Sequence, residues 1–105
     1  MDNFKIIYKI LRELEKNMGN EDYTFYSVSA EHLKIQFEKW EQLLIIMQEN
    51  GYIKGLVLSK SAEDTFQHIA EPIRPKITLK GLEYLADNSF MGRAKEALKM
   101  AGEIL

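Results

Sequence analysis

The first part of the chain has the apolar spacing of an amphipathic helix. Apolar residues recur there every three or four positions, which is the period that places side chains on one buried helix face. Asp2 is a favourable N-cap and Gly19 is a natural stop, so the pattern predicts a helix from Asp2 to about Asn17. The residues expected on its buried face are Phe4, Ile7, Tyr8, Leu11 and Leu14.

The next segment predicts a short strand followed by two helices. Aromatic and β-branched residues favour a strand at about Phe25–Val28. Ser29 is placed to cap a short helix over Ala30–Lys34. A tight turn at Ile35–Gln36 then leads into a longer helix over about Phe37–Asn50. The core-facing residues expected on this longer helix are Trp40, Leu43, Leu44 and Met47.

The opposite side of the longer helix is polar apart from one residue. Ile45 lies among polar side chains on that side, so we expect it to be exposed. A single exposed isoleucine is ordinary on a protein surface. The alternative is that Ile45 contacts a protein partner. The polar residues expected on this side are Glu38, Glu41, Gln42, Gln48 and Glu49.

A β-hairpin is predicted after these helices. Tyr52–Leu58 and Lys76–Leu79 have the composition of strands. The segment between them, Ser59–Pro75, is polar and long for a hairpin connection. Ser61 and Asp64 have a spacing similar to that of a capping box, which predicts a helical turn inside this loop. The residues expected to anchor that turn are Phe66 and Ile69.

Two helices are predicted at the C-terminal end. Thr78 is placed to cap a helix that ends at about Ala86, and Ser89 is placed to cap a helix over Phe90–Glu103. The last helix is rich in alanine and glycine. Two interpretations of this composition stay open, namely close packing against a second copy in a homodimer and coverage of the domain's own core.

The order of these elements is typical of a winged helix-turn-helix domain. In that fold two helices joined by a short turn form the central unit, and the hairpin after them forms the wing. We therefore predict one domain over residues 1–105, of the α+β class but mainly α. Its wing is expected at about residues 52–79, with additional C-terminal helices after it.

The composition argues against several kinds of chemistry. The chain has no cysteine and two histidines, which excludes disulfides, thiolate nucleophiles and thiolate metal sites. Neither His32 nor His68 has a nucleophile or a third ligand at a defined spacing. We therefore expect no enzyme activity, no catalytic residue, no metal and no cofactor. The longest apolar run, Leu43–Met47, is too short to span a membrane, and the N-terminus lacks a signal-peptide pattern, so we expect a cytoplasmic protein.

Three stretches of sequence, in this order, resemble the YjcQ-like family of small proteins. They are MDNFKIIYKILRELEK, KWEQLLIIMQENGYIKG and PKITLKGLEYLADNS. The resemblance extends from Met1 to about Met91 and is weakest through Ser59–Glu71. It implies a winged-helix fold and an origin in Gram-positive bacteria or their prophages, and it implies no particular biochemical role.

The first hypothesis for function is binding to double-stranded DNA as a small transcription regulator. A recognition helix fits the major groove, where glutamine pairs with adenine and lysine reaches guanine or a phosphate. The wing supplies further phosphate or minor-groove contacts. The candidate DNA-binding residues are Lys34, Gln36, Lys39 and Gln42 in the turn unit, and Lys54, Lys60, Arg74 and Lys76 in the wing.

The distribution of charge weakens this hypothesis. The chain has 14 basic and 16 acidic residues, for a net charge of −2. Residues 21–50 contain two basic and six acidic residues, whereas residues 51–80 contain five basic and three acidic ones. Because neutralisation of phosphates drives non-specific DNA affinity, the turn unit offers little of it. The second hypothesis is therefore a winged-helix protein-interaction module that does not bind DNA.

Overall fold

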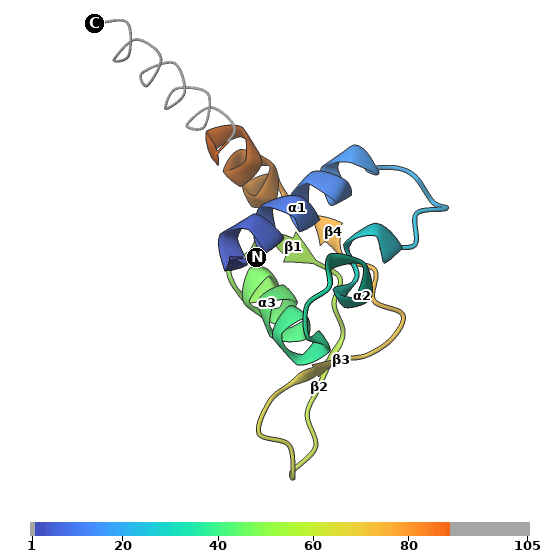
Figure 1. The fold of residues 1–105 in the computed structure, drawn as a ribbon, viewed down its shortest axis with the longest axis vertical. Coiled ribbons are helices and arrows are strands. Elements are labelled where there is room, and N and C mark those ends of the chain that lie inside the picture. The colour runs from blue at the N-terminus through green and yellow to red at the C-terminus, as the bar shows by residue number, and fades with distance from the viewer. Residues whose placement is uncertain (1, 89–105) are drawn as a thin grey trace, which may run out of the picture.

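The computed structural model describes residues 2–88, which form a mainly helical α+β fold (Figure 1). The predicted cap Ser89 and the predicted helix Phe90–Glu103 lie outside these residues, as do both interpretations of that helix, the homodimer contact and the coverage of the domain's own core. No helix among residues 2–88 is long and apolar enough to cross a membrane. The elements are α1 (Asn3–Lys16), the 3-10 helix η1 (Tyr26–Val28), α2 (Ala30–Leu33), α3 (Phe37–Glu49), β1 (Ile53–Lys54), β2 (Leu58–Ser59), β3 (His68–Ile69), β4 (Lys76–Ile77) and a helix over residues 79–88.

Helix α1 begins where the sequence predicts, but its buried face is rotated. The Asp2 carboxylate accepts a hydrogen bond from the Lys5 backbone N–H at 2.9 Å, which confirms the N-cap. The prediction for Phe4 is wrong, because its side chain is 73% exposed. Apolar residues cover much of this helix, so more than one stripe fits the helical period. The buried residues are Ile6, Ile10, Leu11 and Leu14.

The strand predicted at Phe25–Val28 is wrong, since this segment forms η1. Phe25 has a φ of 66°, a left-handed conformation that is incompatible with an extended strand. Phe25 and Val28 are both buried, and their separation by three residues suits the three-residue turn of a 3-10 helix. Burial of these two side chains therefore outweighs the local strand preference.

The two helices of the turn unit are confirmed. The Ser29 hydroxyl accepts from the His32 backbone N–H at 3.1 Å and so caps α2. Lys34 ends α2 in the left-handed conformation, with a φ of 58°. The backbone N–H of Ile35 then donates to the Ala30 carbonyl at 3.0 Å. These bonds set the direction in which the chain enters α3.

Helix α3 lies at the centre of the core. Its predicted core residues are confirmed as buried, and the Trp40 Nε1 donates to the Val28 carbonyl at 2.8 Å. The expectation for Ile45 is wrong, because this side chain is 3% exposed. The residue that emerges on the surface is its neighbour Ile46, which is 48% exposed. An interaction role based on Ile45 is therefore overturned.

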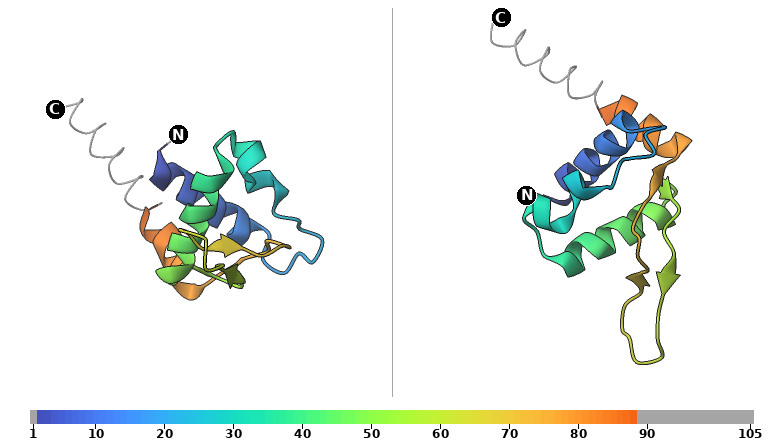
Figure 2. Two further views of the ribbon diagram at one scale, coloured as in Figure 1. Left: turned by 90° about the horizontal axis from the view of Figure 1, so that it is seen from below. Right: turned by 90° about the vertical axis from the view of Figure 1, so that its right-hand side faces the viewer.

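The two strand pairs are parts of one long antiparallel hairpin. Ile53 lies opposite Ile77 in the β1–β4 pair, and Leu58 lies opposite Ile69 in the β2–β3 pair. Between the pairs, residues 55–57 on one side face the longer segment 70–75 on the other. Figure 2 shows the hairpin running from its base beside helix 79–88 to a projecting tip.

The hairpin loop contains a tight turn rather than the predicted helical turn. The Asp64 carboxylate accepts from the Ser61 backbone N–H at 3.0 Å, and this contact lowers the pKa of Asp64. Ile69 is buried, as predicted. Phe66 does not anchor the loop, because its side chain is exposed.

Helix 79–88 is joined to the end of α3. The Thr78 hydroxyl oxygen accepts from the Gly81 backbone N–H at 3.1 Å, which confirms the predicted cap, and the hydroxyl donates to the Gly51 carbonyl. Lys80 Nζ donates to the Asn50 carbonyl at 2.8 Å. These bonds fix helix 79–88 against the carboxyl end of α3 and the base of the hairpin.

Candidate functional site

The turn between α2 and α3 presents three of the predicted DNA-binding residues to solvent. Lys34 ends α2, Gln36 is the N-cap of α3, and Lys39 lies in the first turn of α3; all three are exposed. The Gln36 side chain makes no capping hydrogen bond, so its amide is not used to stabilise the helix start. In helix-turn-helix proteins the first residues of the second helix are those that contact base edges.

Gln42 has a different environment. Its side chain is half-buried, and its Nε2 donates to the Gln67 carbonyl at 3.1 Å. This hydrogen bond joins α3 to the hairpin just before β3. The structure therefore uses the Gln42 amide to position the hairpin. Lys60 lies in the exposed tip that follows β2, beyond this attachment (Figure 1).

Glu41 also attaches the hairpin, and its burial is not apparent in the sequence. The side chain is 3% exposed, although the helical pattern places it on the polar side of α3. Its Oε2 accepts from the Ile69 backbone N–H at 3.0 Å, and its Oε1 lies 2.9 Å from His68 Nδ1. The hydrogen bond to Glu41 raises the pKa of His68. No local sequence signal identifies this contact, because its partners are far apart in the chain.

A third side chain of α3 attaches the other strand of the hairpin. The Gln48 Oε1 accepts from the Leu56 backbone N–H at 2.8 Å, and its Nε2 donates to the Leu56 carbonyl at 3.1 Å. The amide thus pairs with Leu56 as a neighbouring strand would. Both sides of the hairpin are therefore fixed to α3, which sets the position of the tip relative to the α2–α3 turn.

The His68–Glu41 contact predicts a specific dependence of stability on pH. Because the folded-state pKa of His68 is raised above its ordinary value of 6.5, the charged pair stabilises the fold fully below that pH. The stabilisation is lost as the pH rises through the folded-state pKa. The difference in Tm between the wild type and His68→Gln should therefore shrink on going from acid to alkaline buffer.

Thermal unfolding monitored by circular dichroism across this pH range measures the effect. His32→Gln, which changes the exposed histidine on α2, is the control and should keep the wild-type pH dependence. A constant difference between the wild type and His68→Gln at every pH would contradict the contribution assigned to the charged pair.

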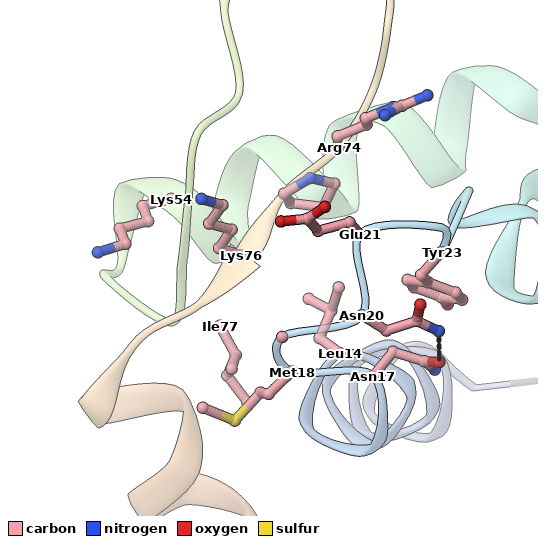
Figure 3. Close-up of a pocket in the computed structure, with 12 residues that line it drawn as sticks. Leu14, Asn17, Met18, Asn20, Glu21, Tyr23, Lys54, Arg74, Lys76 and Ile77 are labelled. Atoms are coloured by element: carbon pink, nitrogen blue, oxygen red, sulfur yellow. Dashed lines mark hydrogen bonds between the residues drawn. The ribbon is translucent and has the colours of Figure 1, made fainter.

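The remaining candidates gather at the base of the hairpin. Lys54, Arg74 and Lys76 line a pocket of about 550 Å³ between the hairpin and the end of α1 (Figure 3). None of the five other candidate residues lines it. The structure thus divides the predicted DNA-binding residues into a group at the α2–α3 turn and the hairpin tip, and a cationic group at the pocket.

Within residues 2–88, no group of three or more histidine or acidic side chains is arranged to hold a metal ion.

Comparison with known proteins identifies the family. The family model described as YjcQ protein matches residues 8–104, so the chain belongs to the YjcQ family. No curated protein and no solved structure matches the chain.

Proposed function

We propose that this member of the YjcQ family is a winged-helix protein that binds double-stranded DNA as a small regulator. The observation that carries the proposal is the exposure of Lys34, Gln36 and Lys39 around the first turn of α3. The order of α1, α2, α3 and an antiparallel hairpin supports the winged-helix assignment.

In the proposed complex the N-terminal end of α3 enters the major groove. Gln36 pairs with an adenine edge, and Lys39 contacts guanine or a phosphate. Lys34, at the end of α2, contacts the phosphate backbone. Lys60, in the tip of the hairpin, supplies a further phosphate contact, because Gln42 and Glu41 hold the hairpin against α3.

The acidic residues of α3 limit the electrostatic part of the affinity. Glu38 and Glu49 are exposed on the same helix as Lys39, so few phosphates are neutralised. We therefore expect modest non-specific affinity. Sequence selection then depends mainly on Gln36.

Paired substitutions test this surface. Lys34→Gln combined with Lys39→Gln should reduce the slope of log affinity against log salt by about 2, since each phosphate contact contributes about 0.9. Fluorescence anisotropy with a labelled random-sequence duplex measures the slope. The matched control, Lys9→Gln combined with Lys16→Gln on the exposed face of α1, removes the same charge and should keep the slope. An equal reduction of this slope in both double variants would contradict the assignment of the phosphate contacts to the α2–α3 turn.

The second candidate function is a protein-interaction module. It is favoured by the exposure of Phe37 and Ile46, two large apolar side chains on α3. The two side chains lie on opposite sides of the helix, and a protein partner with an apolar surface would suit either of them better than DNA. If the wild-type protein does not bind the labelled duplex in the anisotropy experiment, that result supports the protein-interaction module.

A further inference from the structure

The pocket at the base of the hairpin combines an apolar floor with a cationic side. It lies between the end of α1 with the loop after it and the strands β1 and β4 (Figure 3). Leu14, Met18 and Ile77 provide apolar surface, and the three cations come from the hairpin. Glu21 is the one acidic residue among the lining residues.

Two of the three cations are placed together by the strand register. Lys54 lies directly opposite Lys76 in the antiparallel β1–β4 pair. Like charges at directly opposite positions destabilise a sheet. Within residues 2–88 the ion pairs are Arg12–Glu15 and His68–Glu41, so neither lysine nor Arg74 is in one. The two lysine charges repel each other, and a bound anion would relieve that repulsion.

The wall across from these cations is fixed by hydrogen bonds of its own. Asn20 Nδ2 donates to Asn17 Oδ1 at 3.3 Å, and Asn20 Oδ1 accepts from the Asp22 backbone N–H at 3.1 Å. The Tyr23 hydroxyl lies 2.9 Å from Ser27 Oγ. Burial raises the pKa of Tyr23. A wall that is already ordered lowers the entropic cost of binding.

We propose that this pocket binds a small organic anion that carries an apolar or aromatic group. The carboxylate, sulfonate or phosphate of the ligand lies against Lys54 and Lys76, and its apolar part covers Met18 and Ile77. The volume of about 550 Å³ is within the range of small-molecule sites. The site is separate from the α2–α3 turn, so this proposal does not depend on DNA binding.

The fluorescent probe anilinonaphthalene sulfonate has this chemistry and tests the proposal with the full chain. Wild-type protein should bind the probe, and Lys54→Gln combined with Lys76→Gln should weaken binding by about tenfold or more, because two charge-assisted contacts are lost. The matched control is Lys39→Gln combined with Lys60→Gln. It removes the same charge away from the pocket and should bind the probe as the wild type does.

Amide NMR spectra locate the probe. Shifts confined to the neighbourhood of Met18 and Ile77 support the proposal. Three results would overturn it: no binding by the wild type, equal binding by the Lys54/Lys76 double variant, or shifts centred on another surface. Displacement of the probe from the pocket by a short DNA duplex would also overturn it, because the cations would then serve nucleic acid.

Discussion

Replacement of Trp40 by alanine should lower the free energy of unfolding by roughly 3–5 kcal/mol, the usual cost of truncating a buried aromatic residue. The indole ring is buried, and the ring centroids of Phe25 and Phe37 lie 6.1 and 5.6 Å from it. Its Nε1 also donates to the Val28 carbonyl, which joins α3 to η1. Loss of this ring leaves a cavity and an unpaired carbonyl, so the variant should be largely unfolded at physiological temperature.

Urea unfolding followed by far-ultraviolet circular dichroism measures this effect, since Trp40 is the one tryptophan and its fluorescence is lost in the variants. Trp40→Phe separates packing from hydrogen bonding. It keeps most of the ring and leaves the Val28 carbonyl without its donor, which costs about 1–3 kcal/mol. An unchanged unfolding midpoint for Trp40→Ala would show that this residue is not a core anchor.

Gly81→Ala should destabilise the protein by about 1–3 kcal/mol, even though alanine is the better helix former by about 1 kcal/mol. A Cβ atom at position 81 would overlap the Tyr52 carbonyl oxygen and lie 2.7 Å from Ile77 Cγ1. Both atoms belong to the base of the hairpin. The steric overlap therefore reverses the sign expected from helix propensity.

The same urea measurement applies to this variant. Glu83→Ala, at an exposed position of the same helix, is the control and should change stability by less than about 0.5 kcal/mol. A stabilised Gly81→Ala protein would mean that helix 79–88 does not pack this closely against the hairpin.

The helices could be predicted from the sequence because their signals are local. Asp2, Ser29 and Thr78 cap helices where the spacing predicts, since a cap depends on backbone groups within three residues. The core face of α3 likewise follows from one helical period.

The errors arise where tertiary packing determines the outcome. Ile45 and Glu41 lie on the side of α3 that the hairpin covers, so a helical pattern alone assigns them to solvent. Phe25 takes a left-handed conformation because the core accepts its ring. Neither the burial of Ile45 and Glu41 nor the left-handed conformation of Phe25 is indicated by the neighbouring residues in the sequence.

The candidate site could be predicted in part. Exposure of Lys34, Gln36 and Lys39 follows from the turn-unit pattern. The pocket could not be predicted, because it depends on the register that places Lys54 opposite Lys76 and on the path of the loop after α1. The sequence pattern indicates the pocket's cations only as wing contacts to DNA.

The most direct test of the proposed function is a salt titration of wild-type protein with a random-sequence DNA duplex. With phosphate contacts from Lys34, Lys39 and Lys60, log affinity should fall against log salt with a slope of about −3 between about 50 and 200 mM salt. No detectable binding at about 50 mM salt, or binding that does not change with salt, would contradict DNA binding through the α2–α3 turn and the hairpin tip.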